Sequence, residues 1–384
     1  MKLRRVLFQV HLWTGLTLGI VLAVLGLSGS VLVYHDELLE MTQKPAPHAQ
    51  AQGVMLPLDA LLASARGAFT AKHANATIML PHEQGDAAVV RFQSGPVRPG
   101  PQTGTDVFID PATAKVLEVR PAPYNAFITL MHDLHGRLLI PGREGRQVVG
   151  WLGVAMLLLG MSGSVIWWPK RGQWNASFRI RRNARGYWLY RDLHGAVGIW
   201  GLVVFLIVSF SGVAIAFPDT VRSIVTLGTS RSASVPVFDL RNGPAVEPVK
   251  GEKPLGIDGA VALVKARYPD ADIQSIAIPA KRTAALRVMI GNMDDGPVST
   301  AYVDPWRKQI AAMRNVSSGT ADTFMAWQRP LHAGGGWGGL WRILVFLSGL
   351  LPSLFVTTGI VMWVKKRRAR VRIVPSAVTE GANA

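Results

Sequence analysis

Four long apolar segments alternate with more polar stretches along this 384-residue chain. They cover residues 6–34, 148–168, 193–217 and 340–364. A helix needs roughly 20 apolar residues to cross the hydrocarbon core of a bilayer, so each segment is long enough. The pattern predicts an α-helical membrane protein with four transmembrane helices.

Two polar segments, residues 36–147 and 218–339, show shorter periods. Each opens with a helix, an amphipathic one at Leu58 in the first segment and one at Ile257 in the second, and continues with the alternation typical of strands. An Asp-Pro dipeptide in each segment predicts a turn between two strands. The expected strands are residues 87–92, 106–110 and 113–119, then 285–290, 300–304 and 308–313. We predict two small α+β domains.

The two halves of the chain repeat the same elements and the same polar residues. The 18-residue spacing from His11 to Gly29 recurs from His194 to Gly212. A second histidine in each half precedes a span that contains a small hydroxyl residue and a glycine. These positions are His135 with Ser162-Gly163, and His332 with Thr358-Gly359. The repeat predicts an internal duplication, with a pseudo-two-fold axis along the membrane normal.

Basic residues give the chain a net charge of +17, and they gather on alternate sides of the spans. Under the positive-inside rule, both termini and the loop at residues 170–190 face the cytoplasm. This distribution indicates that the basic residues interact with a lipid bilayer and not with a nucleic acid. The chain has no cysteine, which excludes disulfides, iron–sulfur clusters and covalently attached c-type heme. We expect a multi-pass protein of a bacterial inner membrane.

This topology divides the chain into eight parts. They are the first span with its cytoplasmic N-terminus (1–35), a periplasmic domain (36–121), an outer helix with the second span (122–169), a basic cytoplasmic loop (170–190), the third span (191–217), a second periplasmic domain (218–315), an outer segment with the fourth span (316–364) and a basic cytoplasmic tail (365–384).

His11 and His194 form the first candidate site. Both lie just inside the cytoplasmic ends of their spans, where an ionisable side chain is costly and usually faces a partner or a cavity. Neutral imidazole is a common axial ligand of heme iron. Matched residues face each other across a pseudo-two-fold axis, so the two imidazoles are expected to hold one iron between them. The alternative is a pair of interface histidines bonded to backbone or lipid.

His135 and His332 repeat this argument on the external side. His135 lies three residues after His132, on the same face of an expected helix. The second half has Arg329 in place of His132, which favours His135 and His332 as the axial pair. His132 then lies beside the site, although His132 or His35 is an open alternative to His135. Arg329 and Arg342 are candidates for binding heme propionates, because guanidinium groups bind carboxylates in a fork geometry.

The small hydroxyl residues are expected at defined depths. An α-helix rises 1.5 Å per residue, so the 17 residues from His11 to Ser28 cover about 25 Å. Ser162 and Thr358 are therefore expected near the inner histidines, and Ser28 and Ser211 near the outer ones. Helix packing alone is an equally good explanation of these small residues.

The paired helix–strand–strand units ending in Asp110-Pro111 and Asp304-Pro305 resemble PepSY domains. With the histidine and Ser-Gly positions of the spans, nearly the whole chain resembles the PepSY-associated transmembrane helix family. Within that family it is similar to the FoxB-type inner-membrane siderophore reductases. That resemblance implies two non-covalent b-type hemes and a ferric siderophore as the substrate.

The function favoured by these features is transmembrane electron transfer to a ferric siderophore, with reduction of Fe(III) to Fe(II) on the periplasmic side. No flavin or nicotinamide motif is present, so the electron donor is expected to be a cytoplasmic reductase or a quinol. Two alternatives are a module that binds or transports iron-siderophore or heme, and a non-redox structural or regulatory PepSY protein. Heme content distinguishes the three.

Overall fold

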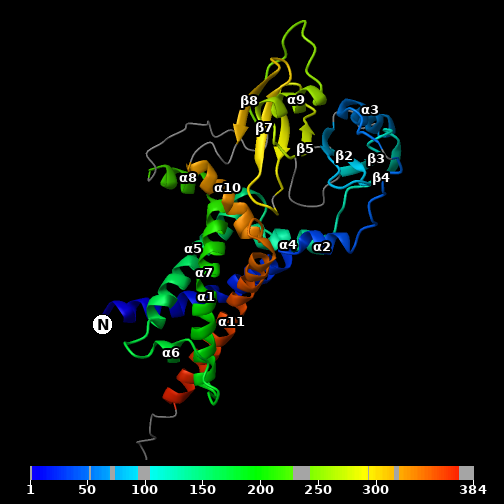
Figure 1. The fold of residues 1–384 in the computed structure, drawn as a ribbon. Helices are drawn as coiled ribbons and strands as arrows, with labels where there is room; N and C mark the ends of the chain where they lie inside the picture. Colours follow the sequence, from blue (N-terminus) through cyan, green and yellow to red (C-terminus); the bar gives the residue numbers. More distant parts are fainter. Residues whose placement is uncertain are drawn as a thin grey trace, which may run out of the picture. The chain divides into compact units, whose positions relative to one another are not determined.

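The computed structural model describes residues 2–51, 53–69, 74–93, 104–227, 243–292, 294–314 and 320–371 (Figure 1). Within these ranges the chain forms two compact units. The helical unit comprises residues up to 33, residues 134–216 and residues from 340 onward. The sheet unit comprises residues 34–133 and 217–339.

The helical unit contains the four predicted spans. They are α1 (Lys2–Leu32), α5 (Gly142–Trp167), α7 (Tyr187–Ala216) and α11 (Gly338–Val371), and all four are long and apolar enough to cross a membrane. Each helix begins before the predicted apolar segment, because polar and basic residues continue the helix beyond the apolar core. The first part of the predicted tail at 365–384 is thus helical, and residues 372–384 lie outside the described residues. The short helix α6 (Trp174–Ser177) lies between α5 and α7.

Small residues allow the helices of this unit to approach closely. A Cβ atom added to Gly26 on α1 would lie 2.2 Å from the carbonyl oxygen of Gly349 on α11. One added to Gly160 on α5 would lie 2.8 Å from the Leu206 side chain on α7. Lipid tails are as apolar as the helices, so close van der Waals packing of this kind holds membrane helices together.

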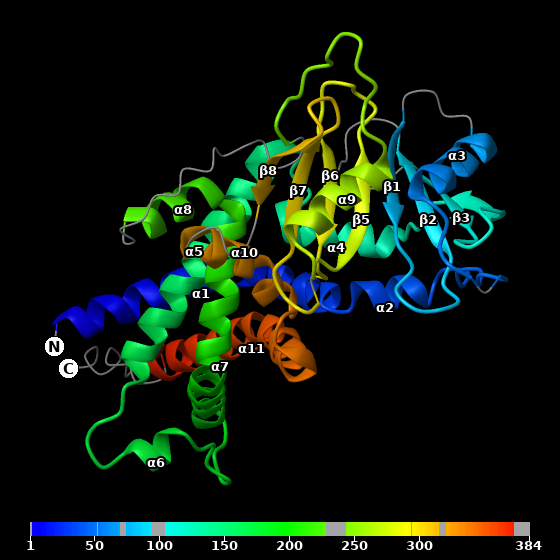
Figure 2. The ribbon, with the colours of Figure 1, turned by 45° about the horizontal axis from the view of Figure 1, so that its top comes forward.

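The sheet unit contains one antiparallel sheet of eight strands, whereas the sequence predicted two separate small domains. The strand order is β4-β3-β2-β1-β5-β6-β7-β8. β1 and β5 pair at the centre, from Ala76↔Ile278 to Met79↔Ser275, as Figure 2 shows. The predicted domains at 36–121 and 218–315 are therefore two halves of one sheet. Their pairing removes two exposed strand edges, which would otherwise be open to association with other chains.

Six of the eight strands match the predicted ones within a few residues, and β1 and β5 were not predicted. The strands are β1 (Asn75–Met79), β2 (Ala88–Gln93), β3 (Gly104–Ile109), β4 (Val116–Pro121), β5 (Ile273–Ile278), β6 (Leu286–Ile290), β7 (Ser299–Asp304) and β8 (Gln309–Arg314). Asp110 and Asp304 do mark the turns between β3 and β4 and between β7 and β8.

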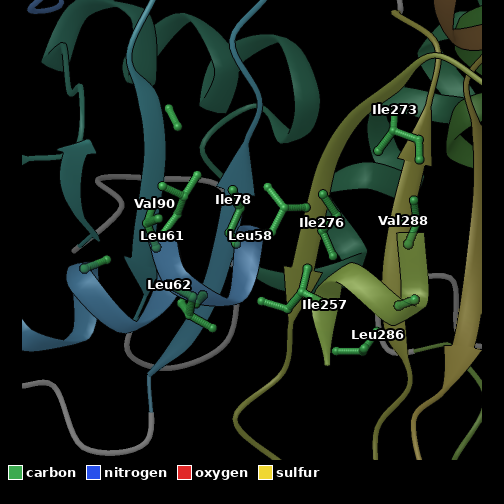
Figure 3. Packing of buried hydrophobic residues seen from close by; sticks show 14 of the residues in the cluster. Leu58, Leu61, Leu62, Ile78, Val90, Ile257, Ile273, Ile276, Leu286 and Val288 are labelled. Carbon is green, nitrogen blue, oxygen red and sulfur yellow. The ribbon is translucent and has the colours of Figure 1, made fainter. Parts of the chain in front are cut away.

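Two helices provide much of the core of the sheet unit. They are α3 (Leu58–Ala68) and α9 (Ile257–Arg267), and both begin at the predicted residue. Alternate side chains of the strands are buried, as Ala88, Val90 and Phe92 are in β2. Figure 3 shows helix residues Leu61 and Ile257 among the buried side chains of this core.

Four shorter helices adjoin the spans in the sequence. They are α2 (His35–Glu40), α4 (Ala126–Arg137), α8 (Pro218–Leu227) and α10 (Thr320–Ala333). In the sheet unit, an ion pair of 2.6 Å between Arg222 and Asp322 joins α8 to α10. These helices carry several of the candidate site residues.

Helices α3 and α9 cap each other. Asp258 of α9 accepts hydrogen bonds from the backbone N–H groups of Leu58 and Asp59, at 2.7 and 3.0 Å. Asp59 of α3 accepts from Ile257 and Asp258, at 3.0 and 3.4 Å. The first N–H groups of a helix have no partner within the helix, and a carboxylate there also interacts favourably with the helix dipole. The two halves of the sheet unit are therefore joined by carboxylates as well as by strands.

Replacing Asp59 or Asp258 with alanine is expected to lower the stability of the sheet unit by about 1 kcal/mol each, since each change removes the caps of the opposite helix. Thermal unfolding of the solubilised protein measures the effect. Asp270→Ala is the matched control, because this exposed carboxylate caps neither helix. Equal unfolding temperatures for all three variants and the wild type would contradict the capping role.

Asp110 holds the turn between β3 and β4. Its buried carboxylate accepts four backbone N–H bonds of 2.8–3.1 Å, from Gln50, Ala51, Ala112 and Thr113. These bonds, that from Ala51 foremost, hold the pKa of Asp110 below its usual value. Favourable bonds to the ionised form contribute stability only while the group is ionised.

Acidification should therefore weaken the turn. The folded pKa of Asp110 lies below the unfolded value, so its contribution is full above a pH of about 4 and is lost as the pH falls through the folded pKa. Asp110→Ala should lower the unfolding temperature by several degrees at neutral pH and by less in acid. Asp304→Ala, which removes only two such bonds, should have the smaller effect. Unfolding scans of both variants between pH 3 and pH 7 test this.

Candidate functional site

The structure brings His11 and His194 together. His11 projects from α1 and His194 from α7, and their ring centres are 6.2 Å apart with the ring planes at 73°. Both histidines lie within helices able to span a membrane. The proximity that the sequence repeat predicted for this pair is thus observed.

Ser162 and Thr358 fix the orientation of these two rings. Ser162 Oγ lies 3.0 Å from His11 Nδ1, and Thr358 Oγ1 lies 2.8 Å from His194 Nδ1. Each hydroxyl donates its one hydrogen to a carbonyl of its own helix, of Leu158 at 2.6 Å and of Leu354 at 2.7 Å. The hydroxyl oxygens therefore accept from the rings, and each Nδ1 carries the proton. The Nε2 atom of each ring is left with a lone pair.

Two imidazoles with free Nε2 lone pairs suit coordination of a single metal. A metal bonds an imidazole nitrogen at about 2 Å, so two imidazoles on opposite sides of one ion have ring centres roughly 6 Å apart. The observed 6.2 Å agrees with this value. Ligating histidines usually donate their second ring N–H to an acceptor, as these do. The separation of the ring centres and the Nδ1 contacts of the inner pair are those expected of two histidines that share one metal ion.

Glycine and phenylalanine shape the space around the inner pair. A Cβ atom added to Gly163 would lie 3.2 Å from the His11 ring. Phe355 packs against His194 with ring centres 5.0 Å apart. The sequence reasoning missed Phe355, although its position three residues before Thr358 places both on one face of α11.

His135 also has a fixed tautomer. Its Nδ1 lies 2.9 Å from the carbonyl oxygen of Leu25 on α1, and a carbonyl only accepts, so Nδ1 carries the proton. Gly29 permits this contact, because an added Cβ would lie 2.7 Å from the ring. Burial lowers the pKa of His135, which keeps the ring neutral. Ser28, predicted near this ring, directly precedes Gly29 in α1, and its hydroxyl donates to the carbonyl oxygens of Val24 and Leu25. Ser211 on α7 donates to the carbonyl oxygen of Val208.

The other predicted partners of the outer site are divided between the two units. His332 and the exposed Arg329 are on α10, in the sheet unit, whereas His135 is in the helical unit. The pairing of His135 with His332 stays a prediction. Arg342 donates from Nε and Nη2 to the Val33 carbonyl oxygen, at 3.1 and 2.9 Å, and so caps the end of α1.

The two alternative outer ligands lie close to each other within the sheet unit. His35 of α2 and His132 of α4 have ring centres 5.6 Å apart with the planes at 79°. His35 Nε2 also lies 3.1 Å from a carboxylate oxygen of Asp36. In the second half of the chain Pro218 and Arg329 occupy the matching positions, so no such pair forms there. Among the described residues, no group of three or more histidine, aspartate or glutamate side chains is placed to hold a metal ion.

A comparison with protein families decides which family this fold belongs to. The model of the PepSY-associated TM region matches residues 8–366, which is nearly the whole chain. The chain belongs to the PepSY-associated transmembrane family. One relative in sequence is an uncharacterized protein of Pseudomonas aeruginosa, which is 28% identical to this chain over 273 residues. The match covers 64% of this chain and 66% of the relative, just under two thirds of its length.

Proposed function

We propose that this PepSY-associated membrane protein is a di-heme reductase of ferric siderophores. The observation that supports the proposal most strongly is the inner pair. The ring centres of His11 and His194 are 6.2 Å apart, and a hydroxyl acceptor on each Nδ1 leaves both Nε2 atoms able to bind a metal ion. A b-type heme bound there would supply a one-electron carrier within the membrane.

The outer heme is proposed on His135 and His332, with His132 or His35 as the alternative ligand. The protonated Nδ1 of His135 supports the first assignment, and the short separation of His35 and His132 supports the second. Arg329 and Arg342 are proposed partners for heme propionates. Arg342 uses two of its five donors on Val33.

The substrate and the topology complete the proposal. The hard oxygen ligands of a siderophore bind Fe(II) far less tightly than Fe(III). Reduction therefore releases the iron from the chelate without acid–base catalysis. The basic segments support a bacterial inner-membrane location with both termini in the cytoplasm. The sheet unit would then face the periplasm, where the siderophore is met. The electron would come from a cytoplasmic reductase or a quinol.

An anaerobic reoxidation experiment tests this function. Dithionite-reduced protein, freed of excess reductant, is mixed with a ferric hydroxamate siderophore and a colorimetric Fe(II) chelator. The expected result is one Fe(II) released for each heme reoxidised. Protein that carries heme but stays reduced would contradict the reductase and leave the binding or transport alternative. Colourless protein would support the structural or regulatory alternative.

The hydroxyl partners of the inner histidines should tune the bound heme. Ser162→Ala or Thr358→Val is expected to weaken heme retention by about 10–100-fold. Loss of the acceptor also makes the imidazole a poorer donor to Fe(III), so the midpoint potential should rise. Heme titration and spectroelectrochemistry measure the two effects.

Ser164→Ala and Thr357→Val are the matched controls. These exposed hydroxyls bond only to carbonyls of their own helices, those of Met161 and Ser353. Both controls should retain the wild-type potential. A shift as large in the controls as in the test variants would rule out the specific role of Ser162 and Thr358.

A further inference from the structure

The loop between α5 and α7 and the first turn of α7 present a set of exposed aromatic rings. Trp168, Trp174, Phe178 and Trp188 are 60%, 39%, 38% and 51% exposed; we call them the aromatic platform. The first three form a connected group, with ring centres 5.2 Å apart for Trp168–Trp174 and 6.4 Å apart for Trp174–Phe178. Large apolar rings that remain exposed in a cluster usually mark an interaction surface.

Specific contacts hold the platform in place within the helical unit. Trp167, whose ring packs on Phe178 at 4.9 Å, donates from Nε1 to the carbonyl oxygen of Ser177 at 3.2 Å. Arg181 forms two bonds with the Asp192 carboxylate, of 2.7 and 2.9 Å. Arg4 of α1 donates to the carbonyl oxygen of Trp168 at 3.4 Å. The loop is therefore a structured surface and not only a connection between spans.

The segment that carries the platform is rich in cations, most of which have no ion-pair partner among the described residues. Asp192 is the one acidic residue in residues 168–192, and its carboxylate forms an ion pair with Arg181. Arg181 and Arg191 also lie over the Trp188 ring, at 5.0 and 5.3 Å. The exposed cations without an ion-pair partner among the described residues are Lys170, Arg171, Arg179, Arg182 and Arg185. Exposed rings and unneutralised cations together favour a ligand that is both anionic and amphipathic.

We propose that the aromatic platform and its cations bind anionic phospholipids of the adjoining leaflet. Trp168 directly follows α5 and Trp188 is the second residue of α7, so both rings lie where spans end and lipid headgroups begin. Tryptophan prefers this interfacial level. Each basic residue near an anionic leaflet strengthens association by roughly fivefold. This position at the ends of two spans favours lipid over an acidic soluble protein.

Lipid titration of the full solubilised chain tests the proposal. Short-chain phosphatidylglycerol and phosphatidylcholine are titrated separately, with binding followed by thermophoresis. The wild type is expected to bind phosphatidylglycerol at least fivefold more tightly. The triple variant Arg179→Gln, Arg182→Gln, Arg185→Gln should lose that preference. The control Arg66→Gln, Lys265→Gln, Arg307→Gln removes the same charge from exposed positions of the sheet unit and should keep it.

A second measurement addresses the rings themselves. In nanodiscs that contain brominated phosphatidylglycerol, Trp168→Phe, Trp174→Phe and Trp188→Phe together should remove a large share of the quenchable tryptophan fluorescence. Equal affinity for the two lipids, or an equal loss of preference in both triple charge variants, would overturn the proposal. A third outcome would also overturn it. If the Arg179, Arg182, Arg185 variant kept its lipid preference but a soluble acidic flavin carrier reduced the variant protein more slowly, the surface would bind a protein.

Discussion

Replacing both His11 and His194 with alanine is expected to reduce the heme content from two to one per chain. The two rings supply the only axial ligands proposed for the inner heme, and each is held by a hydroxyl acceptor on a neighbouring helix. Without both imidazoles, the iron at this site has no protein ligand. Pyridine hemochrome assay of the purified variant measures the loss, and siderophore reduction through the membrane should fall with it.

His82→Ala is the matched control for this change. His82 is an exposed histidine that precedes β2 in the sheet unit, and its removal should leave both hemes in place. Elution of the double variant at the wild-type position in size-exclusion chromatography would show that the fold persists. Two hemes per chain in the folded double variant would exclude His11 and His194 as ligands.

Replacing His135 with alanine is the second large expected effect. It should remove the outer heme, retain the inner one and abolish reduction of ferric siderophore, because the substrate would be left without a nearby electron carrier. The lone pair on Nε2, which follows from the Nδ1 bond to Leu25, supports this expectation. His332→Ala should have the same effect on heme content and on reduction.

The variants His35→Ala and His132→Ala distinguish the alternatives. If His135 and His332 hold the iron, these changes should leave two hemes per chain. If either change removes one heme while His135→Ala does not, the outer heme belongs to the pair His35 and His132, whose ring centres are 5.6 Å apart. Heme content and the optical spectrum of the four single variants separate the two assignments.

The sequence predicted the parts of the fold that follow from local pattern. The spans come from continuous apolar runs, the start of α3 from amphipathic periodicity, the start of α9 from the matching segment of the repeat, and the turns from Asp110 and Asp304. It missed β1 and β5, each only five or six residues long. Their stability depends on pairing across about 200 residues of chain, and local alternation carries no information about such a partner.

The candidate site shows the same division. The matched spacing predicted that His11 and His194 meet, and helical rise placed Ser162 and Thr358 beside them. The same rise placed Ser28 near the outer histidines, and its neighbour Gly29 lies against the His135 ring, whose Nδ1 bonds the Leu25 carbonyl. Depth follows from residue number alone, whereas which atom meets a ring depends on helix rotation. The pairing of His35 with His132 was not foreseen, because the second half has no matching histidines.

The heme content of the wild-type protein is the most direct test of the whole account. The full chain is purified in detergent, its absorption spectrum is recorded before and after dithionite, and heme is quantified per chain. The account predicts two b-type hemes per chain, both reducible. A colourless protein would contradict it, as would two hemes per chain retained after His11→Ala and His194→Ala together.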